Sequence, residues 1–169
     1  MPADTIQRAV NYVLQSQVRD DELPPWPREQ QGYYRTGPGA FKYQNESDAR
    51  SSFALTAAGV TSLYHAARYD TSTIERSLDF IEDTQRLVSA NWSDHYFYYY
   101  GHYYAVQAMF ITGGARWDRY WKVTSRELLD SQHAEGRWLN RVGPGDLFGT
   151  AIACIVLQTP YRYLPILQR

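Results

Sequence analysis

The sequence predicts an all-α protein made of three helical hairpins, each pairing an outer helix with an inner helix. Two observations support this fold class. Six segments have helical periodicity and alternate between amphipathic and apolar character. In addition, the pairs Thr56-Ala57, Tyr104-Ala105 and Thr150-Ala151 recur at spacings of 48 and then 46 residues. Such a period indicates stacked helical pairs.

Three of the segments are amphipathic and are predicted to be the outer helices. Their apolar residues recur at helical spacings, which puts them on one face. Arg8, Glu75 and Arg126 lie on the other faces, as expected for helices that face solvent. The apolar sets are Ile6, Val10, Val13 and Leu14; Ile74, Leu78, Ile81 and Val88; and Trp117, Trp121 and Leu128.

The other three segments are rich in small and apolar residues nearly all round. They cover residues 52–69, about 96–112 and about 147–158. A helix without a polar stripe is a buried one, so these segments are predicted to be the inner helices. Gly113-Gly114 suits the end of the second, and Pro160 stops the third.

The amphipathic segments also share sequence with one another. Residues 6–13 match residues 74–81 position by position in character. A glutamine ends each of the three segments at a matching place, namely Gln17, Gln85 and Gln132. The matches therefore predict one repeated unit rather than three unrelated hairpins.

A long stretch rich in proline and glycine, at about residues 20–50, follows the first outer helix. Connections longer than about 12–15 residues are uncommon unless they are functional or disordered. Two interpretations are open: an insertion packed over a rim, or a lid that covers a ligand. We expect residues 1–169 to form a single domain that includes this loop. The aromatic anchors of the loop are Trp26, Tyr33, Tyr34, Phe41 and Tyr43.

Composition argues against several functional classes. Hydrophobic residues make up 44% and charged residues 21%, a globular balance, and the net charge of −1 offers no basic footprint for nucleic acid. We see no signal peptide, and no segment approaches the ~20 apolar residues needed to cross a bilayer. We therefore expect a cytoplasmic protein without a membrane span. The single cysteine, Cys154, lies in an apolar run and is expected in the core.

One turn motif gives the chain a resemblance to a known superfamily. Residues 132–138, Gln-His-Ala-Glu-Gly-Arg-Trp, match the pattern Gln-x-x-x-Gly-x-Trp. This pattern resembles the QW repeat of the squalene (terpenoid) cyclase and protein prenyltransferase superfamily. A weaker copy runs from Gln85 to Trp92, and Gly32-Tyr33-Tyr34 is the expected replacement for the end of the motif after Gln17.

The resemblance implies an α/α toroid, in which outer and inner helices are arranged concentrically. Gln132, Gly136 and Trp138 would then tie adjacent outer helices at their ends. A full toroid of this superfamily has about twice as many hairpins, so the chain would form half or part of one. The remainder would come from the rest of a longer chain, or from a second copy in a homodimer that closes a six-hairpin ring.

The catalytic signatures of that superfamily are missing. Squalene-type cyclases protonate an alkene with an Asp-x-Asp-Asp cluster, and Asp20-Asp21-Glu22 departs from this pattern. Prenyltransferases hold zinc with an aspartate, a cysteine and a histidine, and Cys154 has no carboxylate two residues before it. The histidines show no tight metal spacing. We therefore expect no metal and no cofactor.

The segment at 94–104 is the richest in polar aromatic side chains. In a helix, four of its tyrosines share one face at spacings of three, four and seven. Such a face suits an isoprenoid or a sugar, because ring faces attract a developing carbocation and tyrosine tips form hydrogen bonds. Alternatively, the tyrosines fill the centre of a ring. The candidate ligand-binding residues are Tyr96, Tyr99, Tyr100, His102 and Tyr103.

Three aspartates, Asp48, Asp94 and Asp146, lie close to the starts of the inner helices. Together at one rim they would form a carboxylate cluster for acid–base chemistry on a sugar. Aspartate is also the ordinary N-cap residue, and capping is the alternative. The catalytic candidates are Asp94, His95 and Asp146.

We favour a repeat module that is not independently catalytic and binds a ligand or partner through an aromatic concave surface. The first alternative is a terpenoid cyclase-like or carbohydrate-acting enzyme, or a fragment of one, with carboxylates at the inner-helix rim. The second alternative is a purely structural assembly repeat, which requires the face from Tyr96 to Tyr103 to be fully buried.

Overall fold

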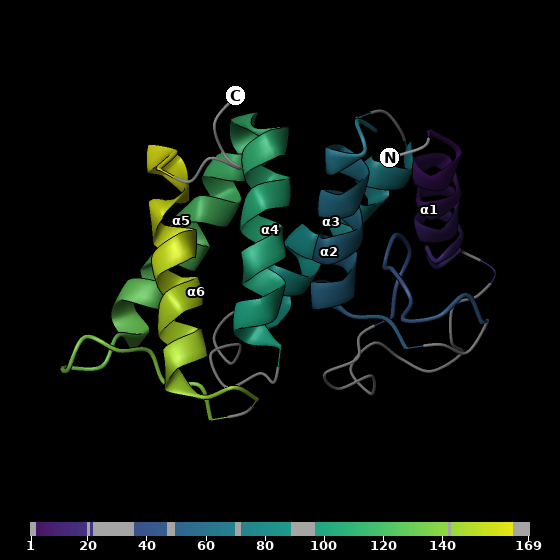
Figure 1. Ribbon diagram of the computed structural model, residues 1–169. Coiled ribbons are helices and arrows are strands. Elements are labelled where there is room, and N and C mark those ends of the chain that lie inside the picture. Colours follow the sequence, from purple (N-terminus) through teal and green to yellow (C-terminus); the bar gives the residue numbers. More distant parts are fainter. Residues whose placement is uncertain are drawn as a thin grey trace. The chain divides into compact units, whose positions relative to one another are not determined.

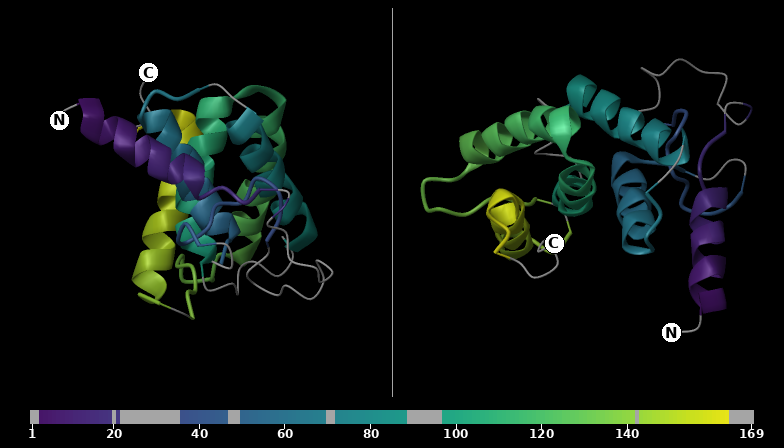
Figure 2. Two further views of the ribbon diagram at one scale, coloured as in Figure 1. Left: turned by 90° about the vertical axis from the view of Figure 1, so that its right-hand side faces the viewer. Right: turned by 90° about the horizontal axis from the view of Figure 1, so that it is seen from above.

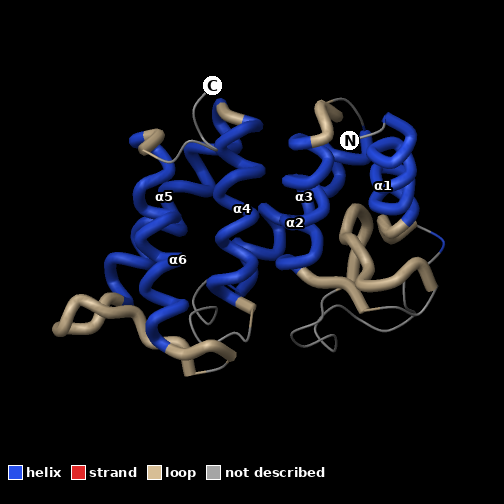
Figure 3. The backbone as a smooth tube through the Cα atoms, in the orientation of Figure 1, coloured by secondary structure: helices blue, strands red, loops and turns tan. Residues whose placement is uncertain are grey.

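The computed structural model describes residues 3–19, 21, 36–46, 50–69, 72–88, 97–141 and 143–163, with the backbone alone at 86–88. Within these ranges the chain forms six α-helices and one short 3-10 helix (Figure 1). No strand occurs in them, and extended pairing is limited to two isolated bridges, Gln17 with Phe41 and Lys42 with Ser51 (Figure 3). The predicted all-α class is confirmed.

The chain divides into two compact units, Met1–Gln85 and Arg86–Arg169. All six predicted helical segments are present, and amphipathic and apolar helices alternate in the predicted order. The first unit holds α1 (Ala3–Gln15), α2 (Phe53–His65) and most of α3 (Ser72–Val88). The second unit holds α4 (Tyr98–Thr112), α5 (Gly114–Ser131), α6 (Asp146–Gln158) and the 3-10 helix η4 (Thr159–Tyr161).

In the first unit, α1 contacts α2 through the face that carries Val10. The first seven residues of α1 are exposed. By contrast, α2 is buried over most of its length, as its apolar composition predicts. A small core cluster of Val18, Ala40 and Phe80 joins the segment after α1, the returning loop and α3.

Specific hydrogen bonds and one left-handed residue set the two ends of α2. Its first turn is capped by Ser52, whose hydroxyl accepts a hydrogen bond of 3.2 Å from the Leu55 N–H. The helix ends at His65, four residues before the predicted boundary. There the chain turns left-handed at Ala67, with φ of 58°, and the Arg68 N–H donates to the Leu63 carbonyl over 2.9 Å.

In the second unit, α4 contacts both α5 and α6, and η4 packs on α4 and α6. The helices α4 and α6 stand side by side, with α5 in a second row behind them (Figures 1 and 2). The predicted glycine cap between α4 and α5 is confirmed. Gly113 has φ of 71° and donates its N–H to the Met109 carbonyl over 2.9 Å.

A close approach at Gly149 brings the loop before α6 onto the helix. A Cβ atom at this position would lie 3.1 Å from the carbonyl oxygen of Trp138 and 3.1 Å from the ring of Tyr99. Glycine therefore allows the chain at Trp138, the helix α6 and the ring from α4 to meet at one point.

Candidate functional site

The turn after α5 has the hydrogen bonds expected of a compact Gln-x-x-x-Gly-x-Trp motif. The Gln132 side-chain amide donates to the Gly136 carbonyl over 2.9 Å. The His133 N–H donates to the Arg137 carbonyl over 2.9 Å, and the Gly136 N–H donates to the His133 carbonyl over 2.7 Å. Gly136 has φ of 85°, a left-handed conformation that glycine adopts readily.

Trp138 anchors this turn to both neighbouring helices. Its side chain is 4% exposed, and its indole N–H donates to the Leu128 carbonyl in the last turn of α5 over 2.7 Å. Its backbone N–H donates to the Thr150 hydroxyl of α6 over 3.0 Å. The tryptophan therefore fixes the entry of the chain into α6 relative to the end of α5.

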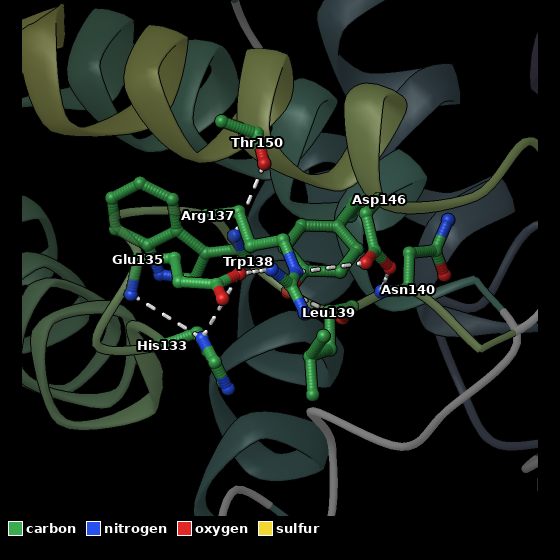
Figure 4. A network of polar contacts seen from close by, with 9 residues as sticks. His133, Glu135, Arg137, Trp138, Leu139, Asn140, Asp146 and Thr150 are labelled. Carbon is green, nitrogen blue, oxygen red and sulfur yellow. Dashed lines mark hydrogen bonds and ion pairs between the residues drawn. The ribbon is translucent and has the colours of Figure 1, made fainter.

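Charged residues tie the same loop to the first turn of α6 (Figure 4). Asp146 accepts a hydrogen bond of 2.8 Å from the Asn140 N–H and pairs with Arg137 over 3.2 Å. Arg137 also pairs with Glu135, which lies 3.8 Å from the ring nitrogen Nδ1 of His133. The network holds the loop against the start of α6, because both carboxylate oxygens of Asp146 contact groups of the loop.

The side chain of Asp146 does not cap α6, so the capping alternative for this aspartate is wrong. The N-cap of α6 is Gly145, and Asp146 is the first residue of the helix, with no side-chain cap bond at this end. A carboxylate in the first turn is still favoured by the helix dipole. Its hydrogen bonds, however, go to Asn140 and Arg137 of the preceding loop.

The first unit contains the same turn in a form that the sequence analysis did not find. Gly39-Ala40-Phe41 takes the place of Gly136-Arg137-Trp138, and Gly39 has φ of 83°, close to the 85° of Gly136. The side-chain amide of Gln17 lies 3.5 Å from the Gly39 carbonyl, as Gln132 contacts Gly136. The predicted replacement, Gly32-Tyr33-Tyr34, lies outside the described residues.

Two hydrogen bonds donated by backbone N–H groups occur in both turns. The Val18 N–H donates to the Ala40 carbonyl over 2.7 Å, as His133 donates to Arg137 in the second unit. The Phe41 N–H donates to the Thr56 hydroxyl of α2 over 3.0 Å, matching the bond from Trp138 to Thr150. Thr56 and Thr150, which the sequence aligns, therefore accept the same hydrogen bond in the two turns.

The tyrosine-rich face of α4 is partly exposed. Tyr99 is 4% exposed, and its hydroxyl donates to the Leu139 carbonyl over 3.0 Å. Tyr100 is 40% exposed and packs edge-on against the ring of Tyr104, which in turn contacts Tyr103. Both of these latter tyrosines are half-buried. The remaining candidates, Asp48, Asp94, His95 and Tyr96, lie outside the described residues.

A buried polar cluster joins α4 to α5. His102 is 1% exposed, and its Nδ1 shares a hydrogen bond of 2.7 Å with the hydroxyl of Tyr120. Burial lowers the pKa of His102 to about 3, so the ring is neutral near pH 7. The structure therefore gives this predicted ligand-binding residue a partner within the unit.

Glu127 lies at the edge of the same cluster and was missed by the sequence analysis. The Tyr98 hydroxyl donates to its carboxylate over 3.4 Å. Burial raises the pKa of Glu127 to about 7, although the bond from Tyr98 acts in the opposite direction. Burial, followed by the charge of Glu127, also raises the pKa of Tyr98. Tyr120 and Glu127 are seven residues apart in α5, which would have been a usable signal.

No family model, curated protein or solved structure matches this chain. Within the described ranges, no helix is both long and apolar enough to span a membrane. The same ranges contain no group of three or more histidine, cysteine, aspartate or glutamate side chains that could hold a metal ion. The geometry of the two turns and of α4 therefore carries the information about function.

Proposed function

We propose that this chain is a helical-repeat module of the α/α toroid type, which binds a ligand or a partner and is not independently catalytic. The repeated turn supports the toroid part of the proposal, because a glutamine, a left-handed glycine and a buried aromatic residue recur with the same hydrogen bonds at Gln17–Phe41 and Gln132–Trp138.

The observation that carries the binding proposal is the exposure of Tyr100. Tyr100 is 40% exposed, whereas the other residues of α4 are buried or half-buried, and its ring packs edge-on against Tyr104. Burial, followed by the neighbouring Tyr104, raises the pKa of Tyr100 above the ordinary tyrosine value, at which the hydroxyl is already neutral near pH 7. A fixed ring with a neutral hydroxyl suits an isoprenoid chain or the face of a sugar.

This exposure also speaks against a purely structural repeat, which requires the whole tyrosine face to be buried. The enzyme alternative rests on Asp94, His95 and Asp146. Of these, Asp146 is bound by Asn140 and Arg137, which supports a structural role for it. Partners compatible with the proposal are a second copy, the remainder of a longer chain, or a small isoprenoid or sugar.

Calorimetric titration with two probes, farnesyl diphosphate and maltohexaose, tests the proposal. We expect one of them to bind, and Tyr100→Ala to weaken that binding about tenfold, the effect of losing roughly 1.4 kcal/mol of ring contact. Tyr43→Ala is the matched control, because Tyr43 is 70% exposed in the other unit. The proposal fails if neither probe binds, or if Tyr100→Ala binds as tightly as the unsubstituted chain.

A further inference from the structure

The turn of the first unit is covered on one side by the start of α3. The side-chain amide of Gln17 donates to the Thr73 carbonyl over 2.8 Å and to the Ser77 hydroxyl over 2.8 Å. The Ser77 hydroxyl in turn donates to the Gly39 carbonyl over 2.7 Å. The first two turns of one amphipathic helix therefore sit on the turn that ends the previous amphipathic helix.

This contact is tight at Gly39. A Cβ atom at this position would overlap the Arg76 carbonyl and lie 2.9 Å from the Ser77 nitrogen. Gln17 is only 7% exposed. The turn therefore needs glycine at residue 39. Ser77 is fully buried with its hydroxyl against Gln17 and Gly39, so the covering helix needs a small residue at that place.

The same turn in the second unit is open. Gln132 and Gly136 are both exposed, and a Cβ atom at Gly136 would meet nothing within 4 Å. On α6, Leu147 is 83% exposed and Ala151, one turn later, is also exposed. A surface with the geometry of Gln17 and Gly39 thus stands without a covering helix among the described residues.

The chain carries a second helix start with a small residue at the matching place. Residues 6–13 align with 74–81, so Thr5 corresponds to Thr73 and Ala9 to Ser77. Alanine at this place is smaller than serine and leaves room for the glycine turn, but it lacks the hydroxyl through which Ser77 contacts Gln17 and Gly39. Residues 3–9 of α1 are all exposed, which makes the matching surface available to another molecule.

We propose that the Gln132–Gly136 turn is a docking site for the first two turns of α1 from a second copy of this chain. The Gln132 side chain donates to the Thr5 carbonyl of that copy, and Ala9 of that copy lies against Gly136. The contact is head-to-tail, so it forms a closed dimer if the rotation closes after two copies, and a longer array otherwise. This inference goes beyond the ligand face on α4 and does not depend on it.

Light scattering of the full chain over a hundredfold range of concentration tests the docking site. We expect at least twice the mass of one chain at the upper end of the range. Ala9→Arg puts a long charged side chain at the contact and should shift the midpoint of association at least tenfold. Gln15→Arg is the matched control, since Gln15 is an exposed residue of the same helix far from the first turns. It should leave the association unchanged.

Two further measurements separate docking from folding. Ala9 is exposed in the single chain, so Ala9→Arg should keep the thermal midpoint of the unsubstituted chain at the lowest concentration. In a Cys154→Ser background, Ala9→Cys with Ala134→Cys, which keeps Gln132 and lies in the same exposed turn, should give covalent dimers with a short bismaleimide, and Gln15→Cys with Ala134→Cys should not. A chain that stays monomeric throughout, or an Ala9→Arg variant that associates normally, would overturn the docking site. Neither result bears on ligand binding at Tyr100.

Discussion

Gln17 ties the turn after α1 to the start of α3. Its side-chain amide lies 2.8 Å from the Thr73 carbonyl in the first turn of α3, and its backbone N–H donates to the Leu14 carbonyl near the end of α1 over 3.4 Å. The equivalent residue of the second unit, Gln132, makes the bond within its own turn and is exposed. One motif therefore exists in a covered and an uncovered form in the same molecule.

The first prediction follows from this difference. Gln17→Ala should lower the free energy of unfolding by about 2 kcal/mol, because the Thr73 carbonyl and the Ser77 hydroxyl lose the donor that they share at Gln17. Gln132→Ala removes an exposed bond and should cost about 0.5 kcal/mol or less in the monomer. Urea unfolding at low protein concentration compares the two, and equal losses would contradict the assignment of covered and uncovered turns.

A second prediction concerns Thr56. Its hydroxyl accepts from the Phe41 N–H over 3.0 Å and donates to the Ser52 carbonyl over 2.8 Å, with the residue fully buried. Thr56→Val should cost about 2 kcal/mol and speed hydrogen exchange at the Phe41 amide, since that donor loses its acceptor. Thr56→Ser retains the hydroxyl and serves as the control. Unchanged exchange at Phe41 in the valine variant would refute the bond.

Glu127 should make the stability of the fold depend on pH between about 4.5 and 7. Its pKa is about 7 in the folded chain and near 4.5 when unfolded, so the folded state holds the proton more strongly. Stability should therefore fall as pH rises from about 4.5 to 7 and stay level above that. Glu127→Gln should remove this decline. Urea unfolding at pH 5 and pH 8 measures it, and an identical pH difference in both proteins would exclude the shift.

His102 should make the stability of the fold depend on pH in the acid range. Its pKa is about 3 in the folded chain against 6.5 when unfolded, because burial disfavours the charged ring. Between these values the unfolded state binds more protons, so stability should fall as pH drops from about 6.5 towards 3. His102→Gln should flatten this part of the profile. If the profile keeps its full slope in the variant between pH 6.5 and 4, the histidine is not buried as described.

Much of the fold could be predicted from local pattern. The alternation of amphipathic and apolar segments gave the six helices in order, because burial on one face or on all sides leaves different periodicities in sequence. The compact motif at 132–138 was recognisable because only three residues separate its glutamine from its glycine. Its hydrogen bonds are local, so spacing alone could reveal them.

The turn at Gln17 and Gly39 in the first unit could not be predicted, because its residues are far apart in the sequence. Residues 18–38 separate Gln17 from Gly39, so no short pattern connects them, and only the folded chain brings Phe41 to Thr56. The role of Asp146 was mistaken for a similar reason. A cap is a local expectation, but the Arg137 and Asn140 groups that bind this carboxylate reach it through a turn of the loop.

The most direct measurement of the central claim compares Gly39→Ala with Gly136→Ala by urea unfolding at a concentration where the chain is monomeric. Both substitutions force alanine into a left-handed conformation, which costs about 1 kcal/mol. At Gly39 the methyl group also meets the backbone of α3 at Arg76 and Ser77, whereas at Gly136 no atom of the described residues lies within 4 Å of it. The account predicts a loss of about 3 kcal/mol or more for Gly39→Ala and about 1 kcal/mol for Gly136→Ala. Equal losses would contradict the claim that one turn is covered and the other open.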